Sequence, residues 1–594
     1  MTEFLTYGDF ARFLERNGEL RRVSVEVDPF LEITEIATRA LREGKPALWF
    51  EKVRGSRFPL VINGLATDRR CALALRKDPE ELGHELLAFV EAMLPPRPRL
   101  LLKHRRILRR FLSTPVRRVR HGVGQHVIVD PDLDALPVIT CWPGDGGRFI
   151  TLPQVVTEDP RTGTRNMGMY RMQVFDRRTT GMHWQIQKGG GFHYYQAEKL
   201  GRPLELAVAI GTDPALLFAT IAALPENIDE AMFAGFLRGR RTEFARAATL
   251  SMNVPAHAEF VLEGVVAPGE RRLEGPFGDH FGHYSQASEF PVFHVKCMTH
   301  RRNAVYPATV VGIPPMEDKF LGDTTQRILG PLVRLLHSEI SDMWAYYEAG
   351  FHNLLVVSVE QRYAKEGLKT ALGLMGMSQL SLTKCIVLVS EGVNVRDFDA
   401  VMKEVGAHFD PHYDFVMIPK VPLDTLDFTS STMNLGSKMI LDATRKRRPE
   451  ASRPRRTPLP DKQAFSSLRS LDRRITGIQF VHETLLLIRV RGQGREVLKK
   501  ILRRAEVRHV AIVATVSEDV DITDRENSIW GVFTRFDAER DVMFFEQEMI
   551  GISPVYHGTM GIDATWKKGY PEPLRMSESV VSTVDALWGR IWKD

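Results

Sequence analysis

The chain repeats one pattern of strands and helices in its C-terminal part. Three stretches match in the same order along the two copies: residues 351–398 with 480–525, 408–417 with 535–544, and 440–450 with 561–571. Each copy alternates apolar, strand-like runs with helix-like segments, the order that builds a parallel sheet. Shared patterning alone would not also repeat the Asp-Ala-Thr segments that begin at Asp442 and Asp563. We therefore expect a duplicated C-terminal α/β domain.

The remaining sequence predicts further domains, as its length of 594 residues requires. Short β-rich runs broken by Gly, Pro and Asp fill the middle of the chain and indicate a barrel or a folded-over sheet. The predicted fold class is α/β (α+β multidomain). Its five parts are an N-terminal α/β domain (1–115), a central split β-barrel of flavin-reductase-like type (116–314), a C-terminal α/β domain (315–447), a linker (448–470) and an extra α/β domain (471–594) that repeats residues 350–450.

Composition narrows the classes of function. The chain has 80 Lys and Arg against 74 Asp and Glu, a net charge of +6, so a strongly basic face for nucleic acid is not expected. Its four cysteines are too few and too scattered for a disulfide framework, which favours a cytoplasmic location. We expect neither a signal peptide nor a membrane-spanning segment. The sequence also lacks the P-loop, GxGxxG, HExxH and GxSxG motifs, so NTPase, zincin and serine hydrolase functions lose their usual support.

Three segments of the β-rich middle concentrate polar residues among glycines, as binding sites do. They are Asn-Met-Gly-Met-Tyr-Arg at residues 166–171, the helical stretch 229–235, and residues 274–284, where two acids flank a Gly-Pro turn. Two carboxyl groups held close repel, so one keeps its proton near neutral pH while a nearby guanidinium holds the other ionised. Glu274, Asp279 and Arg171 would form such a proton-transfer device. A turn or bulge at Gly168 would be needed to bring Asn166 together with Arg171.

Each of these residues also has an ordinary structural explanation. Arg171 would suit a surface salt bridge, Glu230 an exposed helix position, and Glu274 and Asp279 a turn. His280 and His283 have a spacing that could bind a metal, but without further ligands a structural role is favoured. Lys188 with the glycines at 189–191 could receive a phosphate, although a glycine run alone is weak support.

In combination, the motifs resemble one family. NxGxYR at 166–171, EGPFGDHxGxY at 274–284 and GSKMxLDATRK at 436–446 are similar to the motifs of the UbiD family of decarboxylases, which use prenylated FMN. The resemblance covers the chain from near its N-terminus to about Arg445. Residues after the linker lie outside the family's usual body.

The resemblance implies a role for individual residues. Asn166 and Glu230 match the ligands of a divalent metal, usually Mn²⁺, that bridges the protein to the cofactor phosphate, and K⁺ is a further ion that the resemblance allows. Gln187 stands near where relatives place a metal-binding histidine. The residues that match contacts with the prenylated FMN and its metal are Asn166, Met169, Tyr170, Arg171, His183, Trp184, Gln185, Gln187, Lys188, Gly189 and Glu230. Arg171, Glu274 and Asp279 match the catalytic network, with Asp279 in place of the usual Glu. Asp279 is the expected proton donor, and the sequence leaves open which of the two acids delivers the proton.

We therefore predict a carboxy-lyase that removes CO₂ from an aromatic hydroxycarboxylate without oxidising it. The favoured substrate is 1,4-dihydroxy-6-naphthoate of menaquinone biosynthesis, and the alternative is 4-hydroxy-3-polyprenylbenzoate of ubiquinone biosynthesis. An FMN-dependent oxidoreductase and a non-catalytic assembly protein remain open as other classes. Expected partners are the aromatic carboxylate, a flavin prenyltransferase that supplies the cofactor, other copies of the chain in a homo-oligomer, and a peripheral contact with a membrane.

Overall fold

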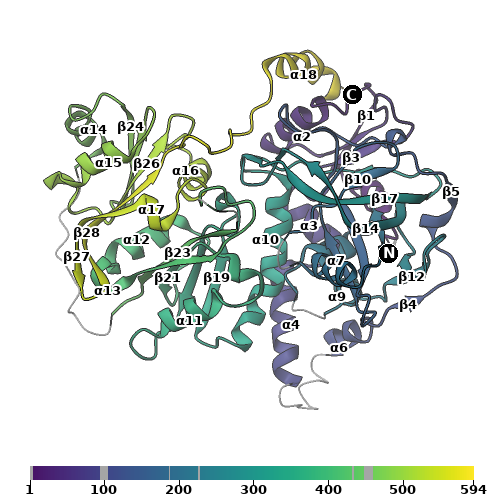
Figure 1. The fold of residues 1–594 in the computed structure, drawn as a ribbon, viewed down its shortest axis with the longest axis horizontal. Coiled ribbons are helices and arrows are strands. Elements are labelled where there is room, and N and C mark those ends of the chain that lie inside the picture. Colours follow the sequence, from purple (N-terminus) through teal and green to yellow (C-terminus); the bar gives the residue numbers. More distant parts are fainter. Residues whose placement is uncertain are drawn as a thin grey trace. The chain divides into compact units, whose positions relative to one another are not determined.

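The computed structural model describes residues 4–93, 105–185, 188–224, 228–430, 432, 434–446 and 459–593. The chain divides into two compact units, Met1–Leu329 together with Glu572–Asp594, and Gly330–Pro571. Both units mix helices with sheets, which confirms the predicted α/β multidomain class. Figure 1 shows the elements of each unit along the chain. Within the described residues, every helix is too short or too polar to span a bilayer.

The first unit begins with a four-stranded sheet, ordered β1 (Leu20–Val23), β2 (Ala47–Phe50), β3 (Leu60–Ile62) and β18 (Tyr306–Pro307). Every residue of β2 and β3 is buried, as expected for strands covered on both faces. The helices of this region are α1 (Tyr7–Arg16), α2 (Glu32–Arg42), α3 (Asp68–Leu75) and α4 (Pro79–Met93). Because β18 follows the central sheet in sequence, its pairing with β3 ties the N-terminal region to that sheet.

A seven-stranded antiparallel sheet forms the middle of the first unit. Its order is β10 (Thr179–Gly181), β17 (Ser288–His300), β14 (Phe260–Glu274), β11 (Leu204–Ile210), β7 (Pro153–Glu158) and β8 (Arg165–Met169), with β5 (Val127–Val129) also on β17. Register shifts interrupt the long β14–β17 pair, and such irregularities bend and twist a sheet. Closure of this sheet into a split barrel stays a prediction.

Three helices of this region carry or support predicted site residues. They are α7 (Gly189–Lys199), α8 (Pro214–Ile221) and α9 (Glu230–Arg238). A core of buried side chains that includes Val156, Met167, Leu216, Ala231 and Phe244 fixes β7 and β8 against α8 and α9. The other helices and strands in this part of the chain are α6 (Arg105–Phe111), β4 (Arg117–Arg118), β6 (Phe149–Ile150), β9 (Met172–Gln173), β12 (Glu243–Arg246), β13 (Asn253–Pro255), β15 (Phe277–Gly278), β16 (Tyr284–Ser285) and α10 (Glu317–Leu329).

The second unit contains two sheets of the same topology. The first is ordered β19 (Ile340–Ala345), β20 (Leu355–Val359), β21 (Cys385–Ser390), β23 (Leu435–Ala443) and β22 (Phe415–Pro422). The second is ordered β24 (Ile475–Val481), β25 (Leu485–Val490), β26 (Ile512–Ser517), β28 (Ser553–Ala564) and β27 (Val542–Ile550). Both have three parallel central strands between antiparallel edges, so the repeat in the sequence corresponds to a repeat in the fold.

The two repeats contact each other reciprocally. Helix α13 (Pro411–Asp414) of the first packs against β28 of the second, and helix α17 (Ala538–Asp541) of the second packs against β23 of the first. The His412 ring lies 4.7 Å from that of His557, and Ser437 donates a 2.9 Å hydrogen bond to Asp537. The other helices of the two repeats are α11 (Glu366–Leu374), α12 (Phe398–His408), α14 (Asp461–Arg469), α15 (Arg495–Leu502) and α16 (Arg525–Phe533).

After β28 the chain returns to the first unit. Its last helix, α18 (Glu578–Ile591), packs on α2. Arg39 on α2 forms an ion pair with Asp585 at 2.7 Å, and its guanidinium lies 5.0 Å from the Trp588 ring. The C-terminal end of the chain is therefore part of the N-terminal region of the fold.

Candidate active site

Tyr170 folds back over strand β8 directly after the strand ends. Gly168 permits this, because a Cβ at Gly168 would collide with the Tyr170 ring. The Tyr170 hydroxyl then donates a 3.2 Å hydrogen bond to the Asn166 side-chain oxygen. Asn166 and Arg171 contact different partners, and the segment 166–171 thus joins two neighbouring clusters of polar residues.

The first cluster pairs Asn166 with Glu230. Glu230 is the first residue of α9, whose N-cap Asp229 accepts a 2.8 Å hydrogen bond from the Ala231 amide. The Glu230 carboxylate accepts hydrogen bonds from the Asn166 side-chain amide (3.0 Å) and the Met167 backbone N–H (2.9 Å). Burial raises the pKa of Glu230 to about 7, although the Met167 N–H opposes the rise.

Burial outweighs the charge of nearby Arg165 at Glu230, and a divalent cation bound at this carboxyl would favour its ionised form. The Asn166 amide oxygen and the Glu230 carboxylate are the hard ligands that such a cation prefers. Among the described residues no group of three or more His, Cys, Asp or Glu could hold a metal ion. A metal between Asn166 and Glu230 would therefore need further oxygen ligands, as a cofactor phosphate would provide.

The start of α7 lies beside this pair. A Cβ on Gly189 would lie 2.6 Å from the Asn166 amide, and one on Gly190 would lie 2.7 Å from the Trp184 Nε1, so only glycines let the helix start this close. The Gly190 N–H donates to the Tyr170 hydroxyl at 3.3 Å. Backbone N–H groups and the helix dipole make a helix start favourable for an anion. A phosphate bound here would lie next to the predicted metal ligands.

The second cluster joins Arg171 to both predicted acids. Arg171 Nε lies 3.3 Å from Glu274 Oε1, and its Nη1 pairs with Asp279 Oδ2. A third guanidinium nitrogen, Nη2, donates to the Ser285 hydroxyl at 2.9 Å, and the Phe277 ring lies 4.7 Å from the guanidinium carbon. Glu274 ends the long strand β14, and Asp279 follows β15. Two distant points of the chain are thus brought to one guanidinium.

His183 completes this cluster on the side of Glu274. Its Nδ1 lies 2.7 Å from Glu274 Oε1. Burial, together with the charge of Arg171, lowers the pKa of His183, so the neutral imidazole donates from Nδ1 and leaves Nε2 as an acceptor. Three buried polar atoms around this cluster have no hydrogen-bond partner among the described residues: His183 Nε2, Glu274 Oε2 and the Trp184 indole nitrogen. Buried polar atoms are rarely left unpaired, so these atoms fit a bound ligand.

Asp279 differs from Glu230 in its electrostatic environment. Burial opposes its ionised form, but hydrogen bonds from His280 and the charge of Arg171 outweigh burial and hold the pKa of Asp279 well below its usual value. Both the backbone N–H and Nδ1 of His280 lie 2.8 Å from Asp279 Oδ1. The pair of acids is therefore bridged by Arg171, with Asp279 ionised in this state.

The other predicted contacts are placed as follows. Met169 ends β8, Gln185 is half-buried in the segment before α7, and Lys188 is the N-cap of α7. Gln187 lies outside the described residues. The cofactor contacts of all four stay predictions.

Two residues that support the acid cluster were not predicted from the sequence. The Asp145 carboxylate accepts hydrogen bonds from the backbone N–H groups of Cys141 (3.0 Å), Trp142 (2.9 Å) and Gly278 (2.7 Å), which fixes the residue before Asp279. Burial raises the pKa of Asp145 to about 6. The Asp in the Pro-Gly-Asp-Gly-Gly turn at 143–147 was a visible signal. Ser285, the other such residue, carries no comparable signal.

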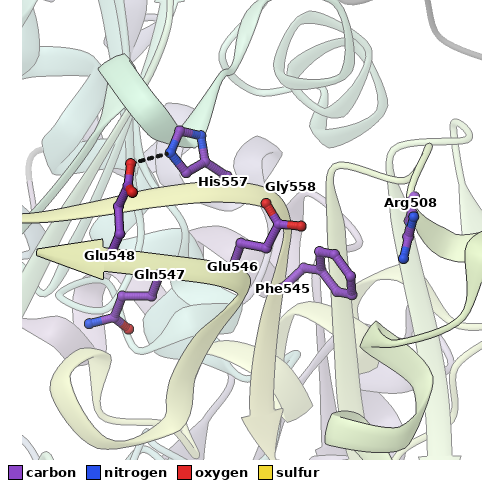
Figure 2. A pocket seen from close by; sticks show the side chains of 7 residues that line it. All are labelled: Arg508, Phe545, Glu546, Gln547, Glu548, His557 and Gly558. Atoms are coloured by element: carbon purple, nitrogen blue, oxygen red, sulfur yellow. Dashed lines mark hydrogen bonds and ion pairs between the residues drawn. The ribbon is translucent and has the colours of Figure 1, made fainter.

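A separate hollow of about 510 Å³ lies in the second repeat, on the hairpin of β27 and β28 (Figure 2). Its lining includes Arg508, whose guanidinium stacks 4.5 Å from the Phe545 ring, and His557, which lies 3.4 Å from Glu548. The β27–β28 pairing is irregular at this point, where Gly558 and Thr559 of β28 face the single residue Phe545 of β27. It contains none of the residues predicted from the sequence.

Three domain models of one family together match most of the chain. Residues 116–314 match the Rift-related domain of 3-octaprenyl-4-hydroxybenzoate carboxy-lyase, residues 11–90 match its N-terminal domain, and residues 319–443 and 476–564 match its C-terminal domain. The chain belongs to the UbiD family. Members and structural neighbours of the UbiD family are decarboxylases, which confirms the predicted carboxy-lyase class.

Relatives divide by how much of the chain they match. An uncharacterised protein of Archaeoglobus fulgidus is 46% identical over 451 residues, 75% of this chain and 93% of its own length. A Chlamydia pneumoniae protein, named as one component of a 4-hydroxybenzoate decarboxylase, is 34% identical over 595 residues, 97% of this chain and 98% of its own. The extra length of this UbiD-family chain is thus shared by some relatives and not by all.

Solved UbiD-class structures resemble the chain over most of its length. The closed form of Sedimentibacter hydroxybenzoicus vanillic acid decarboxylase has a TM-score of 0.69 and 26% identity, and the match covers 79% of this chain and 99% of that one. The enzyme HmfF of Pelotomaculum thermopropionicum, in complex with FMN, has a TM-score of 0.64 and 29% identity, covering 77% and 98%.

Proposed function

We propose that this UbiD-family chain decarboxylates an aromatic hydroxycarboxylate with prenylated FMN and a divalent metal ion, for which Mn²⁺ is the first choice. The observation that carries the proposal is the Arg171 guanidinium shared between Glu274 and Asp279, next to buried polar atoms without partners among the described residues. A reductase that transfers hydride from plain FMN has no need of this pair of acids. The UbiD-class enzyme HmfF has been solved with FMN and, in an evolved dimeric form, with prenylated FMN.

The chain offers groups for each part of that cofactor. Asn166 and Glu230 would hold the metal, and the start of α7 at Gly189 would receive the phosphate with it. The Trp184 indole N–H and His183 Nε2 would hydrogen-bond to polar atoms of the ring system, which explains why both lack partners within the described residues. When bound, the cofactor supplies the electron acceptor that an aromatic ring needs to lose CO₂.

The acid cluster would donate the proton that replaces CO₂ on the ring. Loss of CO₂ leaves a ring carbon that must be protonated, and Asp279 is the proposed donor because it is the less buried of the two acids, at 11% side-chain exposure against 0% for Glu274. A substrate carboxylate near Asp279 would raise its pKa by repulsion between like charges, and so let it take up a proton. Arg171 and His183 would hold Glu274 in place throughout.

Two substrates are proposed in order of preference. We favour 1,4-dihydroxy-6-naphthoate, on the resemblance to longer UbiD-like proteins assigned to menaquinone formation. A hydroxybenzoate is the second candidate, supported by the name of the Chlamydia pneumoniae relative, which matches over nearly the full chain. We further propose a cytoplasmic enzyme that forms homo-oligomers, receives its cofactor from a flavin prenyltransferase and contacts a membrane surface only peripherally.

The test is CO₂ release by the full chain after co-expression with a flavin prenyltransferase. Anaerobic assays would compare dihydroxynaphthoate with prenylated and plain hydroxybenzoates, using the Glu274→Gln variant as the inactive control. We expect bound prenylated FMN by mass and absorbance, and release of CO₂ from one substrate class. Unmodified FMN with reductase activity would favour the oxidoreductase, and no CO₂ from any of these acids would favour an assembly protein.

A further inference from the structure

The segment that follows the second repeat lies against the loop that carries Asp279. The Leu574 N–H donates a 2.9 Å hydrogen bond to the Gly282 carbonyl, and the Tyr284 N–H approaches the Glu572 carbonyl at 3.4 Å. Between them, Pro573 and His283 form an isolated antiparallel β-bridge. Residues 572–574 therefore add a short strand to the edge of residues 282–284. We call this segment the C-terminal strap.

The Leu574 side chain reaches the residue before Asp279. It is 3% exposed, and a Cβ on Gly278 would lie 2.8 Å from Leu574 Cδ2 while colliding with the Trp142 ring on another side. Gly278 is thus packed between Leu574 and Trp142, and its N–H is held by Asp145. The backbone at this point has little room to move, because each neighbour is itself buried.

Asp279 is also tied to the residues that the strap contacts. Its backbone N–H donates to the His283 carbonyl at 3.1 Å, and its carbonyl accepts from the Gly282 N–H at 2.9 Å. A displacement of residues 282–283 would therefore move Asp279 directly. Because the Asp279 carboxylate pairs with Arg171, the strap acts on the acid cluster through only one intervening loop.

Helix α18, which follows the strap in the chain, is fixed to the N-terminal region. Arg21 Nε donates to the carbonyl of Ile591, the last residue of α18, at 2.9 Å, and the Arg21 guanidinium lies 5.6 Å from the Trp592 ring. Together with the pairing of Arg39 and Asp585, these contacts fix α18 on the N-terminal region. The strap is therefore held at one end by α18 and is continuous at the other with the second repeat.

We propose that the C-terminal strap positions the Asp279 loop for catalysis, with Leu574 as the positioning residue. The inference rests on the proposed function in its use of Asp279 as proton donor. It gives the extension beyond the second repeat a task in the active site, which it performs through its contacts with Gly278 and residues 282–284.

The test compares Leu574→Ala with Arg575→Ala in the full chain loaded with prenylated FMN. Arg575 is the next residue of the chain, and its side chain is exposed, so its loss should change neither the loop nor the activity. We expect Leu574→Ala to lower kcat about tenfold to a hundredfold, the scale of small misplacements of a catalytic group, with KM and cofactor content unchanged. Leu574→Met, which refills most of the space, should restore kcat to within a few-fold.

Hydrogen exchange supplies a readout that does not depend on activity. Backbone amides of residues 278–284 should exchange at least about tenfold faster in Leu574→Ala than in Arg575→Ala, because their hydrogen bonds open more often. Equal exchange in the two variants would overturn the inference, and so would faster exchange with unchanged kcat. If the unaltered chain releases no CO₂ while the exchange effect appears, the proposed function fails and the hold of the strap on the loop stands.

Discussion

Two ion-pair clusters built on buried carboxylates look alike in this molecule, and they differ in whether a buried polar atom lacks a partner among the described residues. In the first unit, Arg171 pairs with Glu274 and Asp279, yet Glu274 Oε2 has no hydrogen-bond partner among the described residues. In the second unit, Asp414 and Asp442 share two lysines, Lys365 and Lys446, at distances of 2.8 to 3.3 Å.

The second cluster is closed by its own backbone and neighbours. Asp414 also accepts the Asp410 N–H at 3.0 Å, and Asp442 accepts the Thr444 N–H at 3.2 Å. Burial opposes the ionised form of Asp442, but Lys446, the hydrogen bonds from Thr444 and Lys365 together outweigh burial and lower the pKa of Asp442. A closed cluster of this kind stabilises a fold, whereas one that leaves buried atoms unpaired is available to a ligand. The second cluster therefore stabilises the fold, and the unpaired Glu274 Oε2 supports the chemistry proposed for the first.

The largest expected effect is on stability, from Asp442→Ala. Removing this buried carboxylate leaves Asp414 alone with two lysines and leaves the Thr444 N–H without its acceptor. We therefore expect the free energy of unfolding, measured in urea, to fall by about 3 kcal/mol. Decarboxylation per folded molecule should be unchanged. The matched control is Asp563→Ala in the second repeat, where Lys567 lies 3.9 Å away and the loss should be smaller. A loss of activity without a loss of stability in Asp442→Ala would contradict the comparison.

Substitutions in the Arg171 cluster should instead lower activity and leave stability nearly unchanged. Glu274→Gln and Asp279→Asn keep the shape of each side chain and remove the carboxylate, so we expect at least about a hundredfold loss of kcat, the usual scale of general acid-base terms. The melting temperature should change little. Asp279→Glu is the control, since it keeps the titrating group. Near-normal turnover in both amide variants would remove the proposed role of the pair.

Part of this site could be predicted from the sequence and part could not. The motif at 166–171 and the acids at 274 and 279 were visible because glycines and charged residues alternate there, and the structure brings Arg171 to both acids. The contact between Leu574 and Gly278 was not visible, because it joins points far apart in the sequence and uses an ordinary apolar side chain. Sequence patterns show local conformation and chemistry, but long-range packing depends on the whole fold.

The repeat in the sequence predicted a duplicated α/β fold, and the two sheets of the same topology confirm it. Strand–helix–strand order fixes the direction of the central strands, so the parallel strands of each sheet could be expected from the alternation, whereas the antiparallel edge strands could not. The strap after β28 had no counterpart in the first copy. Its short Pro-Glu-Pro-Leu stretch at 571–574 carries no periodic pattern that would predict an added strand.

A third prediction concerns Asn166 and Glu230, the proposed metal ligands, and its expected effect on metal affinity is of intermediate size. Glu230→Gln removes the only carboxylate of the pair with Asn166, so we expect at least about a tenfold loss of affinity for Mn²⁺ and less cofactor retained on purification. Metal content and flavin absorbance would measure both. The control is Glu270→Gln, a partly exposed residue of β14 that pairs with His294. Equal metal content in the two variants would remove Glu230 from the ligand set.

The smallest effect comes from Glu317, a buried carboxyl at the start of α10 that accepts the Leu65 N–H at 2.6 Å. Burial raises the pKa of Glu317 to about 7, so the folded chain keeps a proton that the unfolded chain, with a pKa near 4.5, has lost. The stabilisation is complete below about pH 4.5 and is lost as the pH rises through about 7. Between about pH 6 and pH 7 the folded state should lose about 1 kcal/mol at this residue.

Glu317→Gln should abolish that slope while leaving kcat within about twofold of normal. Urea unfolding at about pH 6 and pH 7, for the unaltered chain and the variant, measures the difference directly. Glu317 resembles Glu274 in one respect, because its Oε2 also has no hydrogen-bond partner among the described residues, but no motif of glycines and charged residues surrounds it. If Glu317→Gln instead cost as much activity as Glu274→Gln, pairing with Arg171 would not distinguish the catalytic carboxyls of this fold from other buried carboxyls.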